Sequence, residues 1–290
     1  MGYLAGGANS DCTIIGVRVN SKHDGEVDIY AHIIVSDAGL NNTFTKLLPT
    51  EIASRTSFHT LLEQLRPSVA SLTVFIGLKG SPEELGLKKQ NAWIFHSTDP
   101  DAAMKKLMAM SADDAVDAEH PFVFLSFPSA KDRSLLEDED KATAVVLLFA
   151  NYDWFKEWET RRQNNRGDEY EDLKQRMGHR AWEQCCKVFP HLEDTVDYFN
   201  VGTPITNRYY LGQQRGEMYG VGVEKRYDVE VSMHIRPETE VPGLFLTGQD
   251  ILSAGFTPTL LSGVLCSSAI LKRNLFADLG SFHGAIMESK

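Results

Sequence analysis

The 290-residue sequence has few of the residues that mark disulfide-rich and metal-binding proteins. Its four cysteines include the adjacent Cys185 and Cys186, and they form neither a spaced disulfide framework nor the CxxC pairs of a zinc site. We therefore expect thiols packed in a core. The nine histidines contain no His-x-x-His or His-Glu-x-x-His pair, so no metal site is expected.

Positive charge is also scarce. The 29 Lys and Arg residues stand against 40 Asp and Glu residues, which gives a formal net charge of -11. Such a surface repels phosphate backbones, so we expect no nucleic-acid partner. Hydrophobic residues make up 42% of the chain and charged residues 24%, which is ordinary for a globular protein that buries a sizeable core.

Long apolar runs are absent except for residues 251–271, which carry no charge and could nominally span a bilayer. Many Ser, Thr, Gly and Pro residues interrupt this segment, so it does not predict a clear transmembrane helix. The N-terminus has neither a basic flank nor an apolar stretch, and it therefore predicts no signal peptide.

Strand and helix patterns are mixed along the chain and predict an α/β fold of the mixed, α+β kind. Two β-branched segments, 13–19 and 27–35, flank a polar stretch with Asp24-Gly25 and predict an antiparallel hairpin. The middle of the chain predicts a sheet with helices on one face. Its expected strands are 71–78, 121–127 and 143–150, and its expected helices are 101–111 and 167–188.

The most informative segment is a short apolar strand, 243–247, that ends in Gly248 and Asp250. Ligands of open α/β sheets bind beyond the carboxyl ends of strands. Gly248 allows close approach to the backbone, and Asp250 offers two acceptor oxygens suited to sugar or ribityl hydroxyls. The segment predicts a hydroxylated ligand, and the alternative is a buried strand-loop-helix crossover that binds none.

A helix is expected after Gly255-Phe256, with Thr257 as its N-cap, Pro258 at its first position, and an end near Asn274. Its free N–H groups and positive end favour an electron-rich or anionic group beside Asp250. The pyrimidine edge of a flavin, which gains negative charge on reduction, fits such a site.

Two long strings carry a family resemblance. Residues 243–256 (GLFLTGQDILSAGF) and 261–274 (LSGVLCSSAILKRN) closely resemble the C-terminal flavin segment of the retinol-saturase type of phytoene-desaturase-like, FAD-dependent oxidoreductases. Shorter stretches that resemble the same family are spread along nearly the whole chain, at 35–39, 124–132, 152–155 and 212–220.

The resemblance implies a fold and its domains. The chain would be the C-terminal part of an FAD/NAD(P)-binding fold of the amine oxidase and phytoene desaturase type. Residues 1–46 would be a remnant of the FAD-binding domain, 47–205 an inserted mixed-sheet substrate domain, and 206–290 the return to the FAD-binding domain.

The resemblance also implies FAD as the cofactor, NADH or NADPH as a candidate reductant, and a hydrophobic retinoid or carotenoid as the substrate. The implied reaction is saturation of the 13,14 double bond of all-trans-retinol. The implied location is the endoplasmic reticulum membrane, with peripheral membrane contact left open. The residues implied to bind the cofactor are Ser36, Ala38, Gly39, Gly248, Gln249, Asp250, Gly255, Phe256, Thr257 and Pro258.

No catalytic acid or base is assigned. Glu217 and Tyr219, in the glycine-rich return loop, are candidates for lining the site, and turn or packing roles are the stronger expectation. In enzymes of this kind the cofactor carries the hydride, and the protein mainly orients it and excludes water.

The sequence departs from the family pattern in one respect. It contains no Gly-x-Gly-x-x-Gly loop between a strand and a helix, and without that phosphate cradle FAD affinity should collapse. A truncated gene model, a splice form or a fragment would explain the absence. The open alternatives are a non-enzymatic fragment that binds an apolar ligand or a partner without FAD, a carotenoid desaturase or isomerase, and an amine oxidase.

Overall fold

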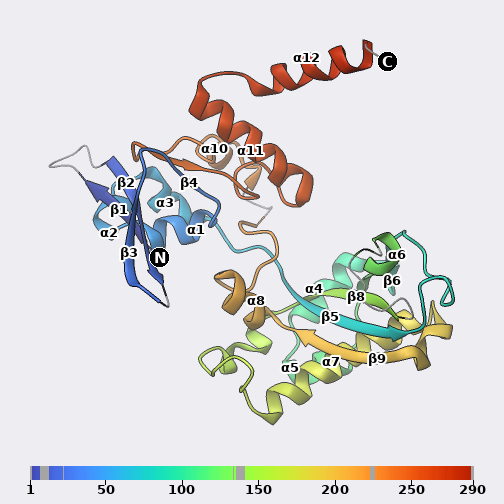
Figure 1. Cartoon of the computed structure of the whole chain (residues 1–290). Helices are drawn as coiled ribbons and strands as arrows, with labels where there is room; N and C mark the ends of the chain where they lie inside the picture. Colours follow the sequence, from blue (N-terminus) through green and yellow to red (C-terminus); the bar gives the residue numbers. More distant parts are fainter. Residues whose placement is uncertain are drawn as a thin grey trace. The chain divides into compact units, whose positions relative to one another are not determined.

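The computed structural model describes residues 2–6, 13–21, 23–132, 134, 141–222 and 226–288, with the backbone alone at 3–6 and 283–288. The chain divides into two compact units (Figure 1). Unit 1 comprises Met1–Ser68 and Tyr219–Lys290, and unit 2 comprises Val69–Met218. Residues 47–68 pack in unit 1 and residues 206–218 in unit 2, and the FAD-binding and substrate domains expected from the resemblance, at 1–46, 47–205 and 206–290, stay a prediction.

Unit 1 contains a three-stranded antiparallel sheet of β1 (Gly2–Gly6), β2 (Thr13–Ser21) and β3 (Gly25–Tyr30). The predicted hairpin is confirmed, and Gly25 pairs with Ser21 at a φ of 72°. The predicted extent of its second strand, 27–35, is wrong. The strand stops at Tyr30, and β4 (Ile34–Ser36) pairs instead in parallel with β10 (Leu244–Leu246). One continuous β-branched run thus serves two sheets, and its local pattern does not reveal the change of partner.

The core of unit 1 is built largely by short helices between residues 40 and 64, which explains why this unit extends beyond residue 46. Phe44 and Phe58 stack with their ring centroids 4.5 Å apart, and both are buried. The elements are α1 (Leu40–Asn42), the π-helical turn η1 (Thr43–Leu47), α2 (Thr50–Ala53) and α3 (Ser57–Gln64).

The C-terminal part of unit 1 is helical: α10 (Val229–Ser232), α11 (Phe256–Leu271) and α12 (Leu275–Glu288). Over the part of the chain that the structure describes, no helix alone is long and apolar enough to cross a bilayer. Residues 256–271 and 275–282 meet the same measure only as a pair, which bends by 116° between the two helices.

Unit 2 contains a five-stranded, fully antiparallel sheet in the order β6-β7-β8-β5-β9. The three predicted strands are confirmed as β5 (Ala70–Lys79), β7 (Phe122–Ser126) and β8 (Lys141–Ala150). Two strands were not predicted, β6 (Ala92–Phe95) and β9 (Val196–Gly202). Both lie at the edges of the sheet, where each pairs with one neighbour only.

Helices cover one face of this sheet, as predicted. The predicted helix 167–188 is α7 (Asp168–Cys186), and 101–111 corresponds to α4 (Pro100–Met108) followed by the separate α5 (Ala112–Asp117). Alternate residues of β5 from Leu72 to Leu78 are buried, whereas Phe75 on the opposite face is 48% exposed. The remaining elements are α6 (Pro128–Lys131), the 3-10 turns η2 (Tyr152–Trp154), η3 (Lys156–Trp158) and η4 (Pro190–Thr195), and α8 (Pro204–Leu211).

The cysteines that the structure describes are core thiols, as expected. Cys185, Cys186 and Cys266 are free and buried. Burial raises the pKa of Cys185 to about 12 and that of Cys186 to about 11. Because the thiolate is the reactive form, these two groups are poor nucleophiles.

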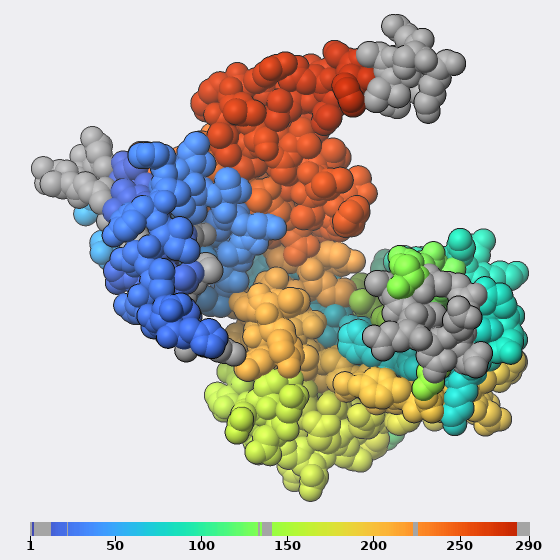
Figure 2. All heavy atoms as spheres, viewed as in Figure 1, coloured from blue at the N-terminus to red at the C-terminus, as the bar shows by residue number. Residues whose placement is uncertain are grey.

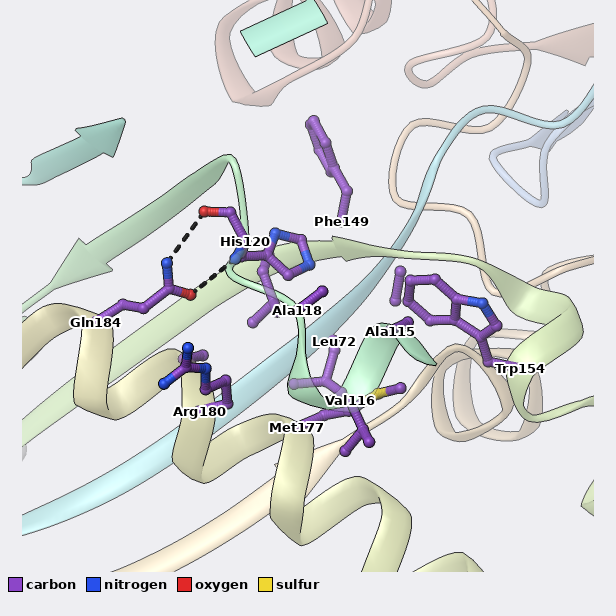
Figure 3. Close-up of a pocket in the computed structure, with 13 residues that line it drawn as sticks. Leu72, Ala115, Val116, Ala118, His120, Phe149, Trp154, Met177, Arg180 and Gln184 are labelled. Carbon is purple, nitrogen blue, oxygen red and sulfur yellow. Dashed lines mark hydrogen bonds between the residues drawn. The ribbon is translucent and has the colours of Figure 1, made fainter. Parts of the chain in front are cut away.

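A buried polar contact joins α7 to the chain just before β7 (Figure 3). The Gln184 side chain accepts from the backbone N–H of His120 at 3.0 Å and donates to its carbonyl at 3.1 Å. The His120 ring places Nδ1 3.2 Å from the Phe122 carbonyl oxygen, while Nε2 has no partner among the described atoms. His120 and Gln184 also line a cavity of about 10 Å³, which has room for about one water molecule.

We expect His120 to make unit 2 sensitive to acid. Burial lowers the pKa of His120 to about 4, whereas an imidazole in the unfolded chain titrates near 6.5. Between these values the unfolded state binds a proton that the folded state does not, so stability falls as pH falls, by on the order of 3 kcal/mol in full. Urea unfolding at pH 7 and pH 5 should show about 2 kcal/mol of this loss, and His120→Asn should remove most of it. A His120→Asn variant with the same pH dependence as the parent would contradict the expectation.

Candidate functional site

The parallel pair β4 and β10 forms the centre of the candidate site. Ile34 pairs with Leu244 and Ser36 with Leu246, so both strands end at the same edge. The segments that follow them, 37–39 and 247–250, therefore start side by side, and the Thr247 N–H donates to the Ser36 carbonyl at 3.0 Å. The carboxyl edge of parallel strands is where ligands bind in α/β sheets. The fold thus brings together six of the predicted residues: Ser36, Ala38, Gly39, Gly248, Gln249 and Asp250.

Asp250 is buried at this edge, with 5% of its surface exposed. One carboxylate oxygen accepts from the Leu40 N–H and the other from the Val221 N–H, each at 2.8 Å. Leu40 is the first residue of α1, where an N–H lacks a partner within the helix. The Asp250 carboxylate therefore links three chain segments, namely its own loop, the start of α1 and residue 221. The direct contact between Asp250 and ribityl hydroxyls, which the sequence led us to expect, stays a prediction.

Arg226 is a buried cation that the sequence interpretation missed. Its guanidinium donates to the carbonyl oxygens of Gln249 at 2.7 Å, Tyr219 at 2.8 Å and Val221 at 2.6 Å. One of its nitrogens lies 3.6 Å from an Asp250 carboxylate oxygen. Burial lowers the pKa of Arg226, and the neighbouring Asp250 acts in the opposite direction. Arg226 thus connects residues 219–221 to the loop at residues 249–250.

Two glycines allow acidic side chains to lie against the backbone here. Gly220 has a φ of 64°, and a Cβ atom placed on it would lie 2.0 Å from an Asp250 oxygen. Gly248 has a φ of 94°, and its Cβ would lie 1.8 Å from an Asp37 oxygen. Asp37 is exposed over much of its surface. Partial desolvation by nearby protein atoms and the negative charge of Asp250 both raise the pKa of Asp37. Packing against the held Asp250 carboxylate therefore requires Gly220, whereas the backbone angle is the main requirement at Gly248.

Helix α11 is attached to the same loop through Ser262. This fully buried hydroxyl accepts from the Gly248 N–H at 2.8 Å and donates to the Thr259 carbonyl at 2.6 Å. This contact was not predicted from the sequence. The structure adds a hydrogen bond that fixes the position of Gly248.

The predicted start of α11 is wrong by two residues. Gly255 is the N-cap, with a φ of 99°, and Phe256 is the first helical residue, so Thr257 and Pro258 are the second and third. Glycine reaches this φ without strain, and the missing N–H of Pro258 still falls within the first turn. The helix ends at Leu271, with Lys272 in the left-handed C-cap position, earlier than the expected Asn274.

The start of α11 leaves room for a bound group. Among the described residues, and apart from the local backbone and chain neighbours, no heavy atom lies within 4 Å of the Cβ positions of Gly255 and Gly263, and Phe256 is 83% exposed. The first N–H groups of a helix attract electron-rich atoms. Small residues, an open helix start and backbone donors fit the polar edge of a planar ring system.

Glu217 and Tyr219, the two residues considered as candidates for lining the site, lie in different units of the structure. Glu217 is buried in unit 2, where its carboxylate accepts from the backbone N–H groups of Gln214 at 3.0 Å and Arg215 at 2.7 Å. It therefore stabilises a turn, which was the stronger expectation. Tyr219 belongs to unit 1 and has a partly exposed side chain, and its carbonyl accepts from Arg226.

The face of the unit 2 sheet opposite α7 carries an aromatic cluster that the sequence did not reveal. Trp93 is 62% exposed and stacks on Phe122 at a centroid distance of 5.1 Å. It also meets Phe124 edge-on at 4.9 Å, and Phe95 and Phe149 lie 5.2 and 5.8 Å from Phe122. The register places Trp93 opposite Phe124 and Phe95 opposite Phe122. These rings form an apolar surface suited to a flat, extended ligand.

Comparison with known proteins gives a partial match to one enzyme group. No protein-family profile matches the chain. The chain is 38% identical over 279 residues to human all-trans-retinol 13,14-reductase, which covers 95% of this chain and 45% of that protein. It is 34% identical over 272 residues to an inactive all-trans-retinol 13,14-reductase of Danio rerio, covering 93% of this chain and 44% of the relative. It is 27% identical over 175 residues to the chloroplastic prolycopene isomerase of Arabidopsis thaliana, covering 58% and 26%. The chain thus spans about half the length of the reductases it matches.

Proposed function

Because this chain is similar to about half of the length of the all-trans-retinol 13,14-reductases, we propose that it forms part of an FAD-dependent oxidoreductase that acts on a conjugated isoprenoid. The proposed reaction is saturation of the 13,14 double bond of all-trans-retinol. The observation that carries the proposal is the parallel β4–β10 edge, where two small-residue loops meet beside the start of α11.

We propose that Ala38, Gly39, Gly248 and Gln249 contact the flavin, with Gly255 to Pro258 at its polar edge. FAD would supply the hydride chemistry when bound. The protein's own part is to hold this edge rigid: Asp250 fastens α1 and the return loop, Arg226 fastens the 249–250 loop, and Ser262 fixes Gly248. The open helix start would place its N–H dipoles where negative charge develops on reduction.

The dinucleotide phosphates need a partner that this sequence lacks. The 290 residues contain no Gly-x-Gly-x-x-Gly loop. Under this proposal the pyrophosphate is bound by residues outside the sequence, in a longer form of the protein or in a second polypeptide. Flavin absorbance of the purified chain, alone and within such a longer form, tests this directly. A longer form that stays colourless under flavin saturation would refute the cofactor assignment.

For the substrate, we propose the aromatic face of the unit 2 sheet as the binding surface. A retinoid is apolar, flat and extended, and exposed aromatic rings gain from covering such a molecule. Trp93 and Phe95 are the most exposed rings of the cluster, and the residues around them on β7 and β8 are apolar.

We expect Trp93→Ala to weaken retinol binding about tenfold, because it removes a large exposed ring from the proposed surface. Quenching of tryptophan fluorescence by added retinol cannot be compared between proteins with different Trp content, so retinol's own emission should be titrated. Tyr209→Ala is the matched control, because Tyr209 is an equally exposed aromatic residue of unit 2 that lies on α8 and is not part of the aromatic cluster. Equal affinities of the two variants would count against this surface.

A second candidate is a non-enzymatic protein that binds an apolar ligand without FAD. It is favoured by the absent phosphate loop and by the similarity to a relative described as an inactive reductase. A purified longer form that takes up retinol, stays colourless and leaves the double bond intact would support this candidate over the enzyme. Product analysis would likewise separate reduction from the isomerisation or desaturation of a carotenoid.

A further inference from the structure

Three polar side chains form a group at one end of the aromatic cluster of unit 2. The Lys131 ammonium donates to the side-chain oxygen of Asn91 and, at 2.7 Å, to the Ser126 hydroxyl. We call these three residues the Lys131 group. Lys131 is the last residue of α6, which Figure 1 shows beside β6 and Figure 2 shows in green at the surface of the protein.

The Lys131 group lies on the same face of the sheet as the aromatic cluster. Alternate residues of a strand point to the same face, so Ser126 shares its face with Phe124 on β7, and Asn91 shares its face with Trp93 on β6. Trp93 lies opposite Phe124 in the antiparallel register, so the next pair on this face is Asn91 and Ser126. An extended molecule that lies on the rings along these strands would therefore end at the Lys131 group.

The Lys131 ammonium can still donate to an oxygen atom of a ligand. Both of its partners are neutral, and within the described part of the chain it has no carboxylate at ion-pairing distance. An ammonium carries three donor hydrogens, and these two contacts use two of them. Asn91 and Lys131 are exposed, so a ligand can reach them.

Two hydrogen bonds fix α6 beside the first residues of β8. The Ser129 N–H donates to the Thr143 hydroxyl at 3.2 Å, and the Thr143 N–H donates to the Ser129 hydroxyl at 2.9 Å. Ser129 is buried, with 2% of its surface exposed. The backbone of α6 and the two neutral partners thus hold the ammonium in one place, and a donor that is already positioned loses less entropy when a ligand binds.

We propose that the Lys131 group binds the terminal oxygen of an isoprenoid and so sets the direction in which the molecule lies on the aromatic cluster. Lys131 donates its third hydrogen to an alcohol or carboxylate oxygen, while the polyene lies along Trp93 and Phe124. The ligand is then an isoprenoid with an oxygen atom at one end. A hydrocarbon carotenoid is disfavoured, because its ends offer no acceptor. This inference rests on the proposed function, since it takes the aromatic cluster as the substrate surface.

Three ligands that differ only at one end test the inference on the full chain. They are retinol, its deoxy analogue with hydrogen in place of the hydroxyl, and retinoate. Lys131→Met should weaken retinol binding about tenfold, and retinoate binding more, because a charge-assisted hydrogen bond is lost. Binding of the deoxy analogue, which has no oxygen, should change by less than about twofold.

Retinol and the deoxy analogue are titrated by their own emission, and retinoate by its displacement of retinol. Lys105→Met is the matched control, because Lys105 is an exposed lysine of unit 2 that lies on α4. The unchanged affinity for the deoxy analogue would show that Lys131→Met leaves the fold and the apolar surface intact.

Two results would overturn the inference. One is an equal loss of affinity for retinol and for the deoxy analogue in Lys131→Met, and the other is a retinol affinity equal to that of Lys105→Met. Trp93→Ala separates this failure from that of the proposed surface, because it should weaken all three ligands alike. If it does so while Lys131→Met is not selective, the surface stands and only the direction fails. A selective Lys131→Met beside an unaffected Trp93→Ala would refute the aromatic surface, and the proposed direction with it.

Discussion

Replacing Asp250 by alanine is expected to destabilise unit 1 by about 3–5 kcal/mol. The change leaves the N–H groups of Leu40 and Val221 without an acceptor inside the protein, and it leaves the buried Arg226 without its nearest carboxylate. Each unpaired buried donor costs about 1–3 kcal/mol. Asp250→Asn keeps the shape and one acceptor oxygen, so it should have an intermediate effect.

Hydrogen exchange of the Leu40 and Val221 amides measures this loss at the site itself. The four tryptophans, Trp93, Trp154, Trp158 and Trp182, all lie in unit 2, so their fluorescence reports that unit separately. The matched control is Asp37→Ala, an exposed carboxylate of the same edge, which should cost less than about 1 kcal/mol. Unchanged exchange in Asp250→Ala would show that the carboxylate does not fasten these segments. If the proposed function holds, a flavin-binding longer form should also lose its flavin in Asp250→Ala and keep it in Asp37→Ala.

Patterns confined to one element were read correctly from the sequence, and changes of pairing partner were not. The alternation in β5 and β8 and the apolar spacing of α7 specify a buried face within each element, so these three were predicted. The run from 27 to 35 looked like one strand because its residue types do not change where its partner changes from β2 to β10. The edge strands β6 and β9 are short or half-polar and carry a weaker pattern.

The candidate site shows the same limit. Glycine and aspartate after a short apolar strand were enough to select Gly248 and Asp250, because that local pattern is typical of a ligand-binding edge. The partners of Asp250 lie 210 and 29 residues away in sequence, at Leu40 and Val221. Arg226 lies in the charged stretch 224–228, which resembles any exposed loop. No local signal distinguishes it, because its burial depends on carbonyl groups that other segments supply.

Gly220→Ala is expected to be among the most disruptive single changes in unit 1. The added methyl group would lie 2.0 Å from an Asp250 oxygen and 2.9 Å from the carboxylate carbon. Because two backbone N–H groups hold that carboxylate, it cannot move aside without losing them. To this clash is added the strain of alanine at a φ of 64°, about 1 kcal/mol. The total should reach at least about 3 kcal/mol, measured by urea unfolding followed by far-UV circular dichroism.

Two other glycines of unit 1 separate the clash from the strain. Gly25 has a similar φ of 72°, and beyond its chain neighbours no atom of the part of the chain that the structure describes lies within 4 Å of its Cβ position, so Gly25→Ala should cost only the strain of about 1 kcal/mol. Gly248→Ala would meet the Asp37 carboxylate, which is exposed and free to rotate away, so its cost should fall between the other two. If Gly220→Ala is no worse than Gly25→Ala, Asp250 must be able to leave its two N–H partners at little cost. The arrangement of the β4–β10 edge would then need a different explanation, because the rigidity of that edge depends on Asp250 staying in place.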